Sequence, residues 1–100
     1  MSDIKVKLNG LFNRIPRRHT SENVKELYAI LDEYEDLLKT LEEDEAYAEQ
    51  VAPFFNALDP IRATIKKSND NKVSKKGKDD LFDEGSGNLK DSMEELMGLI

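Results

Sequence analysis

A seven-residue apolar repeat in residues 21–43 constrains the fold of this chain more than any other feature. Six apolar residues recur at intervals of three and four, namely Val24, Leu27, Leu31, Tyr34, Leu38 and Leu41. This spacing places all six on one face of an α-helix and leaves the charged residues on the other. Tyr28, Ile30 and Leu37 widen the stripe beyond a two-stranded seam. The pattern therefore predicts a long acidic helix in a three- or four-helix packing.

The ends of this helix are predicted from capping residues and prolines. Thr20 or Ser21 can accept a hydrogen bond from a backbone N–H in the first turn. Beyond residue 43 the chain consists mostly of good helix formers until Pro53. We therefore expect one helix from residue 21 to about 51, with a break near Pro53.

A second apolar stripe follows and predicts a second helix. Its members are Tyr47, Val51, Phe54, Leu58, Ile61 and Ile65. Pro53 suits the first turn of a helix that runs from about 53 to 67. Pro60 can kink this helix at residues 59–60. Because the connection to the acidic helix is short, the two helices should lie antiparallel.

Residues 1–15 fit two patterns. Alternation of Ile4, Val6 and Leu8, followed by Asn9-Gly10, is typical of a hairpin. The helical pattern accounts for more residues and leaves only Val6 off the apolar face; its members are Ile4, Leu8, Leu11, Phe12 and Ile15. A helix is favoured over a hairpin because the sequence offers no other strand to pair with.

Residues 68–87 contain only three apolar residues in twenty, so a flexible linker is predicted there. Residues 88–100 then form an amphipathic stripe, which we expect to be helical. Its apolar members are Leu89, Met93, Leu96, Met97 and Ile100. Two alternatives follow: this helix docks on the rest of the chain as a fourth helix, or it enters a groove on a partner protein. The linker favours the second alternative, with these five residues as the partner-binding side chains.

The net charge of −6 is distributed in blocks of alternating sign. Residues 1–20 and 66–78 are basic, whereas residues 21–50 and 79–100 are acidic. The basic blocks contain candidate contacts to phosphates or nucleic acid, namely Arg14, Arg17, Arg18, Lys75 and Lys76. Nucleic-acid binding is nevertheless the less favoured function, because the whole chain is acidic. An acidic inhibitor that mimics DNA is a further alternative.

The sequence does not favour catalysis or a bound cofactor. It contains no cysteine and a single histidine, His19, which has arginines beside it and no evident catalytic partner. The acidic run of residues 42–45 lacks the ligand spacing and the turn glycine of a calcium loop. We expect no catalytic residues, no metal site and no cofactor. An apolar run long enough to span a membrane is missing as well, and a cytoplasmic protein is expected.

Together these observations predict an all-α protein with a helical body (1–67), a flexible linker (68–87) and a C-terminal amphipathic helix (88–100). The expected function is that of a non-enzymatic protein-interaction factor, such as a small regulator, adaptor or assembly chaperone. If no fourth helix is supplied in cis, a homodimer or a partner should supply it.

Overall fold

The computed structural model describes residues 2–16 and 20–99 of the chain. Within these ranges all regular secondary structure is α-helical, which confirms the predicted all-α class. The four helices are α1 (Ser2–Arg14), α2 (Ser21–Glu42), α3 (Ala52–Ser68) and α4 (Lys75–Leu99).

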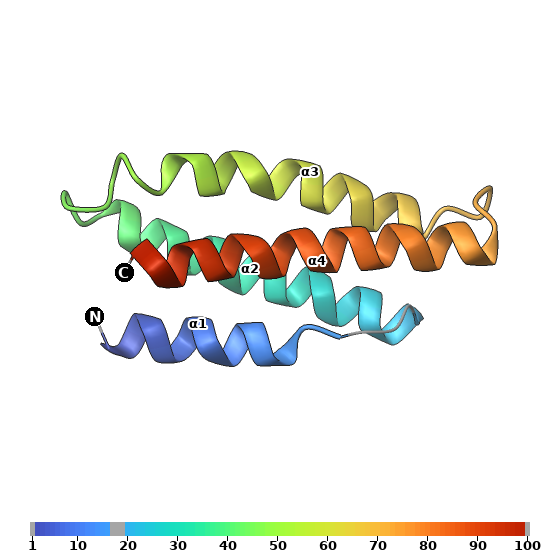
Figure 1. Ribbon diagram of the computed structural model, residues 1–100, viewed down its shortest axis with the longest axis horizontal. Helices are drawn as coiled ribbons and strands as arrows, with labels where there is room; N and C mark the ends of the chain where they lie inside the picture. Colours follow the sequence, from blue (N-terminus) through green and yellow to red (C-terminus); the bar gives the residue numbers. More distant parts are fainter. Residues whose placement is uncertain (1, 17–19, 100) are drawn as a thin grey trace.

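Consecutive helices run in opposite directions, so the described chain forms an up-down-up-down bundle (Figure 1). Helix α4 packs most extensively on α3 and also contacts α1, while α2 contacts both α1 and α3. The four helices therefore close a ring in which α2 and α4 face each other across the core. The bundle measures 45 × 22 × 18 Å.

Residues 2–14 form a helix rather than a hairpin, as the preferred pattern predicted. Leu8, Leu11 and Ile15 are buried in the core, whereas Val6 is 69% exposed. The residue that the helical pattern left off the apolar face therefore lies on the outer surface of α1.

Helix α2 begins as predicted. The side chain of Thr20 caps it, because its Oγ1 accepts a hydrogen bond of 3.0 Å from the backbone N–H of Asn23. All six residues of the seven-residue repeat are buried: Val24, Leu27, Leu31, Tyr34, Leu38 and Leu41.

The predicted extension of this helix to residue 51 is wrong, since α2 ends at Glu42 and residues 43–50 form turns. Two physical effects act against the extension. In a continued helix Glu45 and Glu49 would lie four residues apart on one face, where like charges repel each other. In addition, Oδ1 of Asp44 accepts a hydrogen bond of 3.0 Å from the backbone N–H of Ala46, which closes a local turn.

Helix α3 lies within one residue of its predicted bounds and runs antiparallel to α2, as expected. Pro53 occupies its first turn, where no N–H is required, and Pro60 lies inside the helix on its exposed side. Leu58, Ile61 and Ile65 of the second stripe are buried.

The prediction of a flexible linker over residues 68–87 is wrong for residues 75–87, which form the first half of α4. This half is fixed by features that a count of apolar residues misses. Ser74 caps the helix, as its Oγ accepts a hydrogen bond of 3.1 Å from the backbone N–H of Gly77. Phe82 is fully buried, and the small residues Gly85 and Ser86 occupy core positions beside it.

Gly85 allows α4 to approach α3 closely. A Cβ atom at this position would overlap with Cδ1 of Ile65, whose side chain is fully buried. A Cβ atom at Gly87, by contrast, would meet nothing within 4 Å. The first half of α4 is therefore held in place by its close steric fit against α3 as well as by the burial of apolar surface.

A buried hydrogen bond connects the two helices that face each other across the core. The hydroxyl of Tyr34 on α2 lies 2.8 Å from Oγ of Ser92 on α4. Each polar atom satisfies the other, and the bond fixes the register of α4 against α2.

Substitution of these two glycines by alanine tests the close contact. Gly85→Ala should lower the free energy of unfolding by about 1 kcal/mol, because the clash with Ile65 outweighs the gain in helix propensity. Gly87→Ala, two residues further along the same helix, should raise it by about 0.5–1 kcal/mol. Denaturant unfolding of both variants measures the difference, and an equal stabilisation by both would contradict the packing described here.

The pH dependence of stability tests the buried tyrosine. Burial raises the pKa of Tyr34 to about 12, although the hydrogen bond to Ser92 partly offsets this effect. Since the folded state holds the phenol proton more tightly than the unfolded state, this contribution is complete below pH 10 and is lost as the pH rises towards 12. Titration of tyrosinate absorbance should show one late-ionising group that is missing in Tyr34→Phe. If all three tyrosines of the wild type ionise near pH 10, and Tyr34→Phe loses only amplitude in that range, the burial is contradicted.

Candidate functional site

The C-terminal residues predicted to bind a partner lie mostly in the core of the bundle. Leu89, Met93 and Leu96 are fully buried, and Met97 is half-buried against the core. Ile100 lies outside the described residues. Of the two alternatives for this segment, the structure adopts docking in cis as a fourth helix. Its apolar stripe is therefore not exposed to a partner while the bundle is closed.

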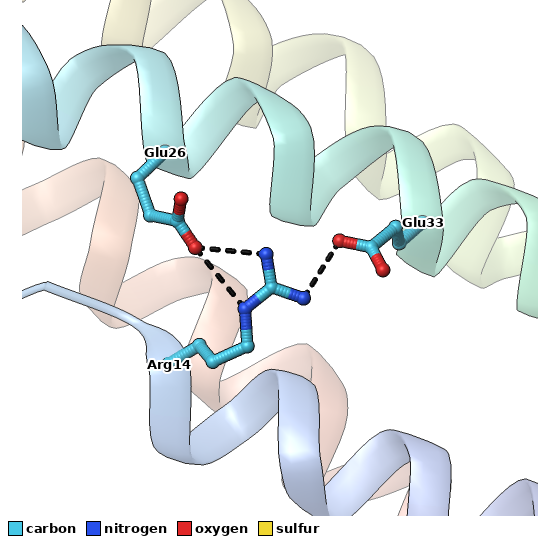
Figure 2. A network of polar contacts seen from close by, with 3 residues as sticks. All are labelled: Arg14, Glu26 and Glu33. Carbon is cyan, nitrogen blue, oxygen red and sulfur yellow. Dashed lines mark hydrogen bonds and ion pairs between the residues drawn. The ribbon is translucent and has the colours of Figure 1, made fainter.

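Arg14, predicted to contact phosphates, is instead engaged with two carboxylates of α2 (Figure 2). Its Nε and Nη2 donate hydrogen bonds of 3.1 and 2.8 Å to Oε1 of Glu26. Its Nη1 donates one of 2.7 Å to Oε2 of Glu33. The hydrogen bonds to Glu26 and Glu33 raise the pKa of Arg14. This arginine therefore ties α1 to α2.

The other predicted phosphate contacts have two different outcomes. Arg17 and Arg18 lie outside the described residues. Lys75 and Lys76 are exposed in the first turn of α4. The antiparallel topology brings the start of α4 and the end of α3 to the same end of the bundle (Figure 1). The lysines of these segments form what we call the lysine end: Lys66, Lys67, Lys72, Lys75, Lys76 and Lys78.

The opposite end of the bundle is acidic. There the end of α2, its connection to α3, the last turns of α4 and the first turns of α1 come together (Figure 1). The α1 segment brings two cations, Lys5 and Lys7, to this end. Residues 40–61 and 91–100 contain nine acidic residues and no lysine or arginine. Eight of these acids form what we call the acidic end: Glu42, Glu43, Asp44, Glu45, Glu49, Asp91, Glu94 and Glu95. Carboxylates thus dominate one end of the bundle, whereas the lysines of residues 66–78 lie at the other end, beside the acids of residues 79–84.

Two grooves of about 410 Å³ each open on the described surface. The first groove lies between α1 and α2, beside Gly10. Because Gly10 has no side chain, this part of the groove stays unfilled. Its charges have both signs, and Arg14 and Glu33 already pair across it. This pairing leaves little net charge to select a ligand.

The second groove lies between the first turns of α3 and the last third of α4, and it belongs to the acidic end. Its lining residues are Pro53, Phe54, Ala57, Asn88, Asp91, Ser92 and Glu95. The α3 side is apolar, and Phe54 is half-buried against the core. The α4 side carries two carboxylates of the same sign, Asp91 and Glu95, both exposed.

Small side chains explain why this groove exists. Ala57 on α3 faces Ser92 on α4, and neither is large enough to fill the space between the helices. The hydroxyl of Ser92 already forms a hydrogen bond with Tyr34, so a ligand in the groove need not supply a hydrogen-bond partner for it. The groove therefore offers an apolar floor and a rim whose charged groups are both carboxylates.

The sequence reading did not identify this groove. Asn88, Asp91 and Glu95 follow a one-turn spacing that was visible in the sequence. Their proximity to Phe54 and Ala57, however, depends on the register between α3 and α4. That register is fixed by the packing of residues that had been assigned to a linker.

Within the described residues, no three side chains of the metal-ligating types lie close enough to hold an ion. His19 is not among these residues. No helix in the described part of the chain is long and apolar enough to cross a membrane.

Comparison with known proteins adds no relative. No family model, no curated protein and no solved structure matches this chain.

Proposed function

We propose that this chain is a non-enzymatic protein-interaction factor, of the regulator, adaptor or assembly-chaperone kind, that recognises a basic surface of a partner protein. The observation that carries the proposal is the segregation of charge along the closed bundle. The acidic end gathers eight carboxylates from α2, from the α2–α3 connection and from α4. They outnumber the two lysines, Lys5 and Lys7, that α1 brings to the same end.

Such a surface favours association with a cationic partner in two ways. The summed field of many like charges steers an oppositely charged protein towards it and raises the association rate. Asp91, Glu94 and Glu95 lie on a helix that is packed in the core, so the partner meets a preorganised surface on this side of the acidic end. The C-terminal segment takes part in this surface as the last turns of α4, which are packed in the bundle.

Two alternatives use other aspects of the same charge pattern. The lysine end favours nucleic-acid binding, since six exposed or half-buried lysines lie close in sequence around one aspartate, Asp70. The net charge of −6 opposes it, because a polyanion is repelled by the rest of the molecule. An inhibitor that mimics DNA is a special case of the proposal, in which the basic partner is a DNA-binding protein.

Affinity purification from the source organism, with the full chain as bait, tests the proposal. The acidic-end variant replaces Glu42, Glu43, Glu45 and Glu49 by glutamine. Proteins with basic surfaces should be captured by the wild-type bait, and their yield should fall about tenfold with this variant. The yield should also fall at about 0.5 M salt, where exposed charges are screened.

A matched control removes four acids far from the acidic end, through Glu22→Gln, Asp80→Asn, Asp83→Asn and Glu84→Gln. This control bait should capture the same proteins to within about twofold, since it leaves the proposed surface intact. Equal losses with both variants would contradict the proposal. Capture that disappears after nuclease treatment, and that requires Lys75 and Lys76, would replace it by nucleic-acid binding.

A further inference from the structure

The geometry points to a specific occupant of the groove between α3 and α4: a short amphipathic helix of a partner protein, with one or two apolar anchors flanked by lysine or arginine. This inference rests on the proposed function and names the kind of partner segment that the acidic end recognises. It is carried by the combination of an apolar floor and an anionic rim in one groove.

The floor selects an apolar anchor. Pro53, Phe54 and Ala57 supply its α3 side, and Ser92 has its hydrogen bond satisfied by Tyr34. A large aliphatic or aromatic side chain placed there would be removed from water and would leave no buried polar group without a partner. A volume of about 410 Å³ accommodates an inserted side chain or two rather than a whole polypeptide segment.

The rim selects cations at a helical spacing. Asp91 and Glu95 are four residues apart on α4, which separates them by about 6 Å along the axis. Lysine or arginine residues three or four apart on a partner helix have the same separation. Asn88 extends the row by one more turn with an amide that can both donate and accept. A helix with cations on both sides of an apolar anchor therefore matches the groove in shape and in charge.

A second copy of this chain is a poorer occupant. Its most basic surface is the lysine end, where Val73 is the apolar residue between Lys72 and Lys75. Val73 is half-buried and packs close to Gly77, so that it is not presented as an anchor. The groove between α1 and α2 is a poorer site for the same helix, because its two cations offset its two carboxylates and leave no net negative charge to attract lysines.

Titration of the full chain with a synthetic helix tests the inference. The probe is a labelled peptide of about 14 residues with two leucines four apart and lysines around them, and binding is followed by fluorescence anisotropy. The reference is a peptide of the same composition in which the leucine spacing is scrambled. The periodic peptide should bind about tenfold more tightly, since only it combines the anchors with the cation spacing.

Two pairs of matched variants separate the groove from general electrostatics. Asp91→Asn with Glu95→Gln should weaken binding about tenfold, whereas Asp80→Asn with Glu84→Gln, at the same spacing on the same helix, should change it less than about twofold. Ala57→Leu fills the groove without altering charge and should also weaken binding about tenfold. Ala63→Leu, at an exposed position of α3, should leave binding unchanged. Unaltered helicity by circular dichroism confirms that each variant is folded.

Several results would overturn the inference. If Ala57→Leu binds as tightly as the wild type, or if both peptides bind equally, the acidic surface attracts cations without using the groove. That outcome leaves the proposed function standing, because it is judged by protein capture. If sedimentation shows a mass that rises with concentration and Ala57→Leu abolishes the rise, a second copy occupies the groove instead.

Discussion

The packing of α4 against α3 is the contact on which the rest of the molecule depends. It requires a residue without a side chain at position 85, where Ile65 fills the space, and it places Phe82, Leu89 and Met93 in the core. With this helix in place the apolar stripe of α2 is covered within one chain. Without it that stripe would be exposed, and a second copy or a partner would have to cover it.

The electrostatic character of the protein follows from this topology. In an up-down-up-down bundle the first and third connections lie at one end and the second connection at the other (Figure 1). The basic block around residues 66–78 contains the third connection, while the acidic run after α2 forms the second. The largest acidic cluster and the largest lysine cluster therefore lie at opposite ends of the bundle. Ion pairs from Arg14 and Arg62 to α2 hold the sides of the bundle together between those ends.

Sequence reasoning predicted the parts of the fold whose signal is apolar periodicity. The repeat from Val24 to Leu41 identified the core face of α2, and the helical pattern of residues 1–15 prevailed over the hairpin. It failed where the signal lies in small or polar residues. Gly85 and Ser86 lie within the predicted flexible linker, yet they are core positions whose small size allows close approach. The groove could not be predicted, because its two walls are brought together only by the helix that was missed.

Native-state amide hydrogen exchange tests whether residues 75–99 form one continuous helix that belongs to the core. Amides from Leu81 to Leu96 should exchange slowly, with protection close to that of the most protected amides of α2 and α3. Exchange of residues 81–87 at the rate of an unstructured peptide, beside protected residues 89–96, would contradict it. That result would restore the flexible linker and the tethered C-terminal helix predicted from the sequence.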